Sequence, residues 1–242
     1  MVTAIVLAAG RSSRMGGTTN KQFLQLLGKP VLWYSLAACE ECPAVNAVVL
    51  VRRPDEAETA EKLRQNFSKI IAVADGGPER QNSVWNGLEK CPPTTQIVAV
   101  HDGARPLVTP ALFEATVLSA QQHGTGIAAT KIVDTIKEAD QHRIVIRTVD
   151  RTRLWAVQTP QTVRHELLRR AYAEVFRAGI VVTDEAAAVE RLGLPVHLVE
   201  TPFLNLKLTT PADLPILAAL LRARNRPARA NPSPTNRTKT KP

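Results

Sequence analysis

The segment AIVLAAGRSSRMGG, residues 4–17, begins as an apolar strand-like run and breaks at Gly10 into a loop of small residues with two arginines. Its spacing excludes the dinucleotide fingerprint and the P-loop, because both patterns counted from Gly10 require glycine where the chain has Met15. A small-residue turn after a strand still exposes backbone N–H groups that bind anions. Arg11 and Arg14 add positive charge, so the segment favours a phosphate-binding loop, with an ordinary strand-to-helix turn as the alternative.

Further segments with charged side chains lie near the ends of strand-like runs. NKQF (20–23) follows the opening loop, DGGPERQNSV (75–84) and HDGARP (101–106) come at the ends of expected strands, and NLKLTTP (205–211) overlaps the last one. Ligands of open α/β sheets bind at the carboxyl ends of the strands, so we expect these segments to meet at one edge of the sheet. A cleft with several cations is typical of a site for a ligand with several phosphates. The cations that could face it are Arg14, Lys21, Arg80, Arg105 and Lys207.

The order of apolar patterns predicts how the chain positions these segments. Short β-branched runs alternate with helical patterns, which is typical of βαβ units in a Rossmann-like α/β fold with a mostly parallel sheet flanked by helices. We expect one folded domain over residues 1–224. The expected strands are 4–8, 47–51, 70–73, 97–101, 196–200 and 203–208; the expected helices are 31–42, 56–67, 83–91, 110–122, 166–177, 184–192 and a last one capped by Thr210.

Residues 131–151, KIVDTIKEADQHRIVIRTVDR, break this alternation. Apolar and polar residues alternate in two arms around Asp140 to His142, which predicts a β-hairpin that projects from the sheet. A two-stranded arm is marginally stable alone in water, so it should pack on another surface. A second copy of the chain is the natural candidate, and we expect a homodimer.

The formal net charge of +9 is concentrated at the end of the chain. Residues 222–242 hold seven basic side chains and no acidic one; without them, 24 basic side chains face 22 acidic ones, a net of +2. We therefore expect a nearly neutral domain, followed over 225–242 by a basic, Pro-rich tail too polar to fold. A weak contact of this tail with nucleic acid or another acidic partner is the alternative.

The remaining composition predicts a cytoplasmic protein. Apolar runs stay below the ~18 residues of a membrane span, and Met1 is followed at once by a strand rather than by a signal peptide. Three cysteines make a disulfide framework improbable. Cys39 and Cys42 have the spacing of metal ligands but lack a second pair, so we expect no metal held by protein side chains alone.

Taken in order, the motifs LAAGRSSRMG, NKQF, DGGPERQNSV, HDGARP, TVDR, TPQ, TDEA and NLKLTTP closely resemble those of the 2-C-methyl-D-erythritol 4-phosphate cytidylyltransferases of the non-mevalonate isoprenoid pathway. The resemblance runs from about residue 2 to residue 221. It implies transfer of a cytidylyl group from CTP to the phosphate of methylerythritol phosphate, with release of pyrophosphate. The attacking phosphate oxygen is already ionised at neutral pH, so no strong general base is required. Mg²⁺ would bridge the triphosphate oxygens.

The resemblance also implies a role for each site residue. Arg14 and Lys21 would stabilise the transition state at the α-phosphate. The nucleotide would be bound by Ala8, Ala9, Gly10, Gly77, Arg80, Ser83, Asp102 and Gly103. Methylerythritol phosphate would be positioned by Arg151, Lys207, Arg105, Thr135, Thr159 and Thr183. The hairpin arm would carry Arg151 and Thr135 into the site of the neighbouring subunit.

Two other functions stay open at this point. Ribitol 5-phosphate cytidylyltransferases share the fold and the chemistry, but Gly103 and Ala104 in HDGARP and Val149 and Asp150 in TVDR favour methylerythritol phosphate. A nucleic-acid-binding protein that acts through the basic tail is the alternative from another class. Pro78 has no backbone N–H to offer to a base, which leaves pyrimidine selectivity open.

Overall fold

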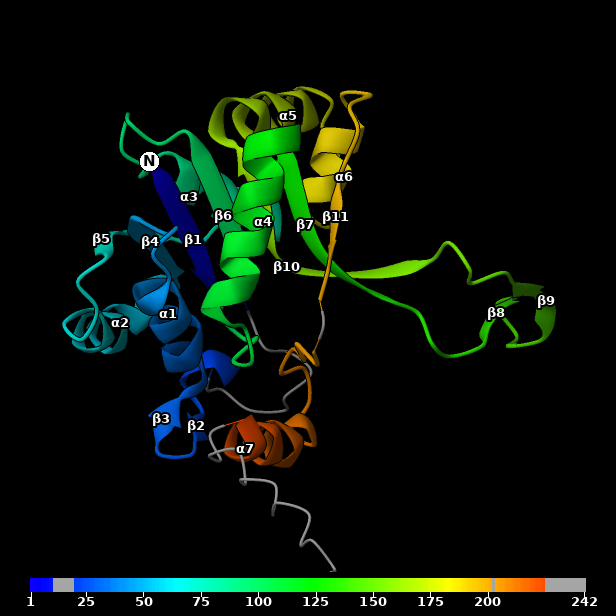
Figure 1. Ribbon diagram of the computed structural model, residues 1–242, viewed down its shortest axis with the longest axis horizontal. Helices are drawn as coiled ribbons and strands as arrows, with labels where there is room; N and C mark the ends of the chain where they lie inside the picture. The colour runs from blue at the N-terminus through cyan, green and yellow to red at the C-terminus, as the bar shows by residue number, and fades with distance from the viewer. Residues whose placement is uncertain (11–19, 202, 225–242) are drawn as a thin grey trace, which may run out of the picture.

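A seven-stranded sheet forms the centre of the computed structural model, which describes residues 1–10, 20–201 and 203–224. The strand order is β11-β7-β10-β6-β1-β4-β5 (Figure 1). The strands are β1 (Val2–Ala8), β4 (Ala47–Arg52), β5 (Ile70–Asp75), β6 (Ile97–Asp102), β7 (Thr125–Lys131), β10 (Trp155–Arg164) and β11 (Leu198–Glu200). Two-residue strands β2 (Gln25–Leu26) and β3 (Lys29–Pro30) pair separately. The expected α/β fold is confirmed.

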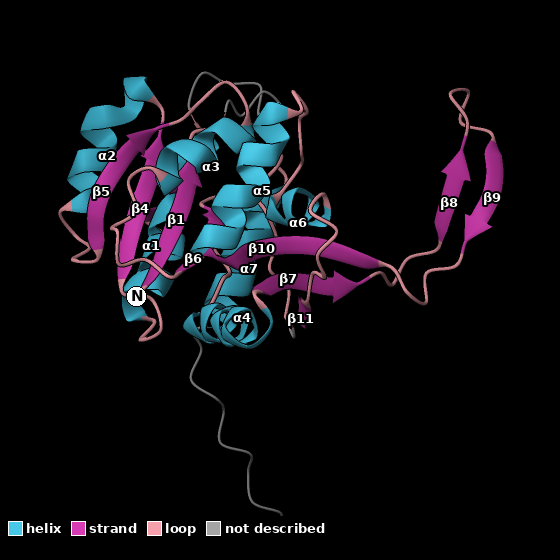
Figure 2. Cartoon of the chain, turned by 90° about the horizontal axis from the view of Figure 1, so that it is seen from above, coloured by secondary structure: helices cyan, strands magenta, loops and turns pink. Residues whose placement is uncertain are grey.

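Helices cover both faces of this sheet: α1 (Val31–Glu41), α2 (Ala57–Arg64) and α4 (Pro110–His123) lie on one face, and α3 (Arg80–Leu88), α5 (His165–Arg177) and α6 (Glu185–Glu190) lie on the other. Helix α7 (Asp213–Arg224) packs instead in a cluster with Leu26 of β2 and Val31 of α1. The short 3₁₀ helices are η2 (Lys21–Phe23) and η3 (Pro54–Glu56). Figure 2 shows the strands between the two helical layers. In the described residues, no helix is both long and apolar enough to cross a membrane.

Strand β1 is fully buried, and its sequence is apolar except at Thr3, whose hydroxyl bonds that of Thr95 at 2.8 Å. Ala4, Val6 and Ala8 belong to the core that includes residues of α1, α2 and α4. Ile5 and Leu7 belong to the core that includes residues of α3, α5 and α6. Successive side chains of a strand point to opposite faces, so a strand covered by helices on both sides presents apolar residues to both.

The sheet is parallel around β1 and antiparallel around β10. β1 pairs in parallel with β4 and β6, whereas β10 runs antiparallel to β6 and β7. The expectation of a mostly parallel sheet is confirmed, since β4 with β5 and β7 with β11 also pair in parallel. Sequence patterns assigned neither β7 nor β10. The antiparallel strand brings the TPQ motif, residues 159–161, alongside the end of β6, because Gln161 pairs with Val100.

The predicted hairpin arm is present and protrudes far from the sheet (Figures 1 and 2). Its strands are β8 (Ile136–Ala139) and β9 (Val145–Val149), paired antiparallel. The Asp140 carboxylate forms the turn by accepting the backbone N–H groups of His142 and Ile144, both at 2.9 Å. Val145 and its neighbour Ile146 are exposed on the arm. Homodimerisation through it stays a prediction.

The C-terminal region differs from the predicted pattern. Residues 203–208 form no strand, and the last helix begins at Asp213 rather than directly after a Thr210 cap. The Asp213 carboxylate accepts the N–H groups of Thr209 at 2.8 Å and Thr210 at 2.7 Å, so it closes the turn before the helix. Leu208 instead binds the HDGARP loop through its N–H, which donates to the Ala104 carbonyl at 2.8 Å.

Candidate active site

A cavity of about 1270 Å³ lies at the carboxyl ends of β1, β4, β5 and β6. The segments singled out from the sequence therefore meet at one edge of the sheet, as expected for an open α/β fold. The predicted site residues along its wall are Ala9, Gly10, Lys21, Gly77, Arg80, Ser83, Asp102 and Lys207. Arg14 and Arg11 lie outside the described residues.

Two buried side chains hold Lys21 at the cavity. The Asn20 side-chain amide donates to the Ala8 carbonyl at 2.8 Å and to the Glu56 carboxylate at 3.0 Å. The Gln22 side-chain amide donates to the Leu7 carbonyl at 3.0 Å. The short helix η2 that contains Lys21 is thus fixed to the end of β1 through the carbonyls of Leu7 and Ala8.

The glycines of DGGP let two loops approach closely. A Cβ atom added to Gly76 would lie 2.2 Å from the Ala9 Cβ, so the space between these loops admits only glycine. The Gly77 N–H donates to the Ser83 hydroxyl at 3.0 Å. The following helix was expected to begin at residue 83, but α3 begins three residues earlier and Glu79 is its N-cap.

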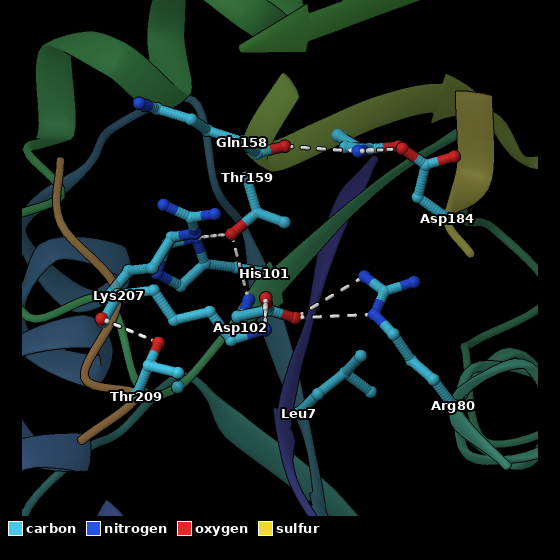
Figure 3. Close-up of polar contacts among 12 residues, drawn as sticks. Leu7, Arg80, His101, Asp102, Gln158, Thr159, Asp184, Lys207 and Thr209 are labelled. Carbon is cyan, nitrogen blue, oxygen red and sulfur yellow. Dashed lines mark hydrogen bonds and ion pairs between the residues drawn. The ribbon is translucent and has the colours of Figure 1, made fainter. Parts of the chain in front are cut away.

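The Asp102 carboxylate lies between two cations of the cavity wall (Figure 3). One oxygen accepts from Lys207 Nζ at 2.6 Å, and the other lies 3.4 Å from both Nε and Nη2 of Arg80. Burial alone would raise the pKa of Asp102, but the charges of Arg80 and Lys207 outweigh it and hold that pKa far below its usual range. Asp102 is therefore an anion at every physiological pH.

A threonine and a histidine support Asp102 from behind the cavity wall. The Thr159 hydroxyl accepts the Asp102 backbone N–H at 3.0 Å and lies 3.1 Å from His101 Nδ1. Burial lowers the pKa of His101 to about 3, so its ring is neutral. Because the hydroxyl already accepts from Asp102, it is placed to donate its own proton to the imidazole nitrogen.

Arg105 does not line the cavity but supports the part of its wall that contains Lys207. Its Nη1 donates to the Asn205 carbonyl at 2.7 Å, and the Asn205 side-chain amide donates to the Thr159 carbonyl at 2.8 Å. These bonds hold the irregular segment that contains Lys207 against β6 and β10. Gly103 and Ala8 are also buried next to the cavity rather than on its surface.

Three predicted substrate-positioning residues lie away from the cavity. Thr135 and Arg151 flank the two arm strands and are exposed, and the Arg151 guanidinium donates to the Val133 carbonyl. Thr183 is exposed just before α6. A single chain therefore does not bring these three side chains to the wall formed by Asp102 and Lys207.

Sequence reasoning missed several residues of the site. Arg53 and Asp55 line the cavity and form an ion pair with each other. Glu185 is completely buried and binds Arg80 behind the cavity wall. The sequence feature that could have identified Glu185 is its position at the start of the apolar run EAAAV. A carboxylate in such a run is buried only if a cation lies beside it.

Among the described residues of the cavity wall, two carboxylates, Asp102 and Asp55, are already engaged with cations, and the third, Glu79, caps helix α3. Asp102 faces Arg80 and Lys207, and Asp55 faces Arg53. The described ranges contain no group of three or more His, Cys, Asp or Glu side chains arranged to hold a metal ion. A magnesium ion here would be bound mainly by oxygens of its ligand and by water, which suits the chemistry of Mg²⁺.

Together the sheet, the close glycine loops and the cationic cavity define a Rossmann-like α/β protein with a site for a phosphorylated ligand. The chain belongs to the 2-C-methyl-D-erythritol 4-phosphate cytidylyltransferase family, whose model matches residues 2–223. A relative of that name from Pelotomaculum thermopropionicum is 44% identical over 227 residues, which cover 92% of this chain and 95% of the relative.

Solved structures agree with this assignment. The 2-C-methyl-D-erythritol 4-phosphate cytidylyltransferase of Thermus thermophilus has a TM-score of 0.75 at 32% identity, covering 90% of this chain and 98% of that chain. A 4-diphosphocytidyl-2C-methyl-D-erythritol synthase from Anaerococcus prevotii has a TM-score of 0.81 at 27% identity, covering 91% and 98%. The fold around the cavity is thus the fold of this family.

The buried neutral His101 predicts that acid destabilises the protein. Its folded pKa of about 3 lies below the ordinary value of 6.5, so between these pH values the unfolded chain binds a proton that the folded chain does not. Lowering the pH from 7 to 5 should cost about 2 kcal/mol of unfolding free energy through this one group. Urea unfolding at both pH values measures it.

The His101→Asn variant is the matched comparison for this effect. It should be less stable at pH 7 but lose about 2 kcal/mol less on acidification than the wild type does. Burial also lowers the pKa of His165, but this residue is present in both proteins, so its contribution cancels in the comparison. An equal loss in wild type and variant would show that His101 is not the group that binds the proton.

Proposed function

We propose that this chain transfers CMP from CTP to 2-C-methyl-D-erythritol 4-phosphate, forming 4-diphosphocytidyl-2-C-methyl-D-erythritol and pyrophosphate for isoprenoid precursor biosynthesis. The observation that carries the proposal is the convergence of Lys21, Arg80, Asp102 and Lys207 on one cavity in a chain of this family. The cavity of about 1270 Å³ exceeds the usual range for one small ligand, which suits two substrates held together.

In this reaction an oxygen of the methylerythritol phosphate attacks the α-phosphorus of CTP. The bond from that phosphorus to the bridging β-phosphate oxygen breaks, and the electron pair leaves with pyrophosphate. The protein must align two anions that repel each other and stabilise the charge that builds at the α-phosphate. Lys21, fixed to the end of β1, and Arg14, seven residues before it in the sequence, are the proposed stabilising cations. Lys207 and Arg151 are the proposed cations for the second substrate.

The proposed nucleotide subsite lies between the loops after β1, β5 and β6. Backbone groups at Gly10 and Gly77 would approach the base, and Asp102 would accept hydrogen bonds from ribose hydroxyls. The Gly77 N–H is directed to Ser83, so recognition of the base would rely on carbonyls and on the Ser83 hydroxyl. Mg²⁺ is the proposed cofactor; when bound, it neutralises charge on the triphosphate oxygens.

We also propose that the active form is a homodimer in the cytoplasm. Apolar side chains of the arm such as Ile146 are exposed and need a packing partner, and Arg151 and Thr135 beside it do not reach the cavity of their own chain. An arm that docks on the other subunit would supply both residues to its site. The cysteines Cys39, Cys42 and Cys91 are all free, which fits a reducing compartment.

The activity is tested by pyrophosphate release from purified protein with Mg²⁺. CTP with methylerythritol phosphate should give turnover, whereas UTP or ATP, and ribitol 5-phosphate as acceptor, should give little. Lys21→Ala should reduce kcat about 100-fold with an unchanged circular dichroism spectrum, because it removes a charge used in the transition state. Turnover only with ribitol 5-phosphate, or none with either acceptor, would overturn the proposal.

The shared site is tested by mixing two inactive variants. In a heterodimer of Lys21→Ala and Arg151→Ala subunits, one of the two sites combines an intact Lys21 with an intact Arg151 from the other subunit. About half of the wild-type activity should therefore return. Two affinity tags select the heterodimer, and Arg147→Ala, an exposed change on the same arm, is the control expected to stay active. A heterodimer as inactive as its parents would mean that each site is built within one chain.

A further inference from the structure

Glu185 binds the guanidinium group of Arg80 from behind the cavity wall. Oε1 lies 2.6 Å from Nη1 and Oε2 lies 3.0 Å from Nη2, which is a bidentate pair. The Glu185 side chain is 0% exposed, whereas the Arg80 side chain is 26% exposed and reaches the cavity. Glu185 therefore meets the cavity only through Arg80.

Tyr172 is a second hydrogen-bond partner of the Glu185 carboxylate. Its hydroxyl donates to Glu185 Oε1 at 2.9 Å, from a ring that is fully buried in the core formed by α5 and α6. Burial and the neighbouring carboxylate raise the pKa of Tyr172 well above its usual range, so the hydroxyl keeps its proton. Helix α5 thus fixes Glu185, and Glu185 fixes Arg80.

This arrangement determines which edge of Arg80 faces the cavity. The outer nitrogens Nη1 and Nη2 bind Glu185, and the remaining edge with Nε and Nη2 faces Asp102. A buried carboxylate costs several kcal/mol to desolvate, and well-packed apolar residues often stabilise a fold as well as an ion pair does. A bidentate pair at this position is therefore better explained by orientation than by stability.

The orientation of Arg80 in turn affects Lys207. Asp102 uses one oxygen for Arg80, at 3.4 Å, and the other for Lys207, at 2.6 Å. Without Glu185, Arg80 would be free to turn and take both oxygens of Asp102 in a bidentate pair. Lys207 would then lose its counterion, and the carboxylate would no longer be available to a ligand.

We propose that Glu185, supported by Tyr172, is a positioning residue that holds Arg80 and Asp102 in the geometry required by the nucleotide. The proposal rests on the proposed function for the identity of that nucleotide, CTP. It assigns a role to a side chain that touches neither substrate and to a tyrosine in the core between two helices.

The test combines Glu185→Gln, which keeps the shape and removes the charge, with Tyr172→Phe, which removes only the hydroxyl. Glu185→Gln should raise the KM for CTP about 10-fold, with kcat changed far less, as is typical when the partner of a site residue is lost. Tyr172→Phe should raise the KM for CTP about 3-fold. The double variant should match Glu185→Gln alone, because Tyr172 acts through Glu185.

Three controls separate positioning from general damage. Glu190→Gln, an exposed change in the same helix, should behave as wild type. In an Arg80→Lys background, Glu185→Gln should change the KM for CTP less than about 2-fold, since the bidentate partner is gone. Calorimetric titration with Mg²⁺ and CTP should rank the CTP affinities of the variants in the same order as their KM values for CTP.

Each result has one interpretation. If the wild type turns over but Glu185→Gln keeps its KM for CTP, or if the effects of Tyr172→Phe and Glu185→Gln add, the positioning role is wrong. If the wild type does not turn over, the proposed function fails, and CTP affinity by calorimetry still decides the role of Glu185. If Glu185→Gln does not fold, Tyr172→Phe decides it: an unchanged affinity for CTP overturns the proposal.

Discussion

The Asp102 carboxylate, shared between Arg80 and Lys207, is the interaction on which the rest of the site depends. It joins the end of β6 to the start of α3 and to the segment before α7, which are far apart in the sequence. A carboxylate with 11% of its side chain exposed is stable as an anion only when cations and donors surround it. The cavity wall is therefore a set of mutually compensated charges rather than a patch of free cations.

The sheet makes this arrangement possible. Parallel strands β1, β4, β5 and β6 bring their carboxyl ends to one edge, and β10, running the opposite way, places Thr159 beside the backbone of Asp102. Arg105 and Asn205 then hold the irregular C-terminal segment in place. Asp102 and Arg80 are thus each held by a residue that does not line the cavity, Thr159 and Glu185 respectively, and such supporting residues keep a site rigid.

Sequence patterns were sufficient for the parallel half of the fold and for the edge of the sheet where the motifs meet. Short β-branched runs between helical patterns identified β1, β4, β5 and β6, and the alternation of apolar and polar residues around Asp140 identified the arm. Short-range patterns failed where distant contacts decide the structure. Residues 203–208 resemble a strand, but their partners are the HDGARP loop and β10 rather than a neighbouring strand. Strand β10 was missed because its central residues TPQT lack apolar alternation.

The site itself was only half predictable. Cations at strand ends identified Lys21, Arg80 and Lys207, but spacing alone cannot show that two carboxylates compensate them. Glu185 is 105 residues from Arg80 in the sequence, and only the packing of α6 against the sheet brings the two together. An anion among cations changes which ligands the site can bind. The chemistry of the site therefore depends on the balance of positive and negative charges in the cavity wall and not on its cations alone.

Calorimetric titration of Asp102→Asn with Mg²⁺ and CTP tests this central claim most directly. The substitution makes the cavity more positive, so a site that worked through net charge alone would bind the triphosphate more tightly. If Asp102 sets the positions of Arg80 and Lys207, the variant should instead bind CTP at least about 10-fold more weakly, a loss of about 1.4 kcal/mol, with its fold intact by circular dichroism. Equal or tighter binding would contradict the account.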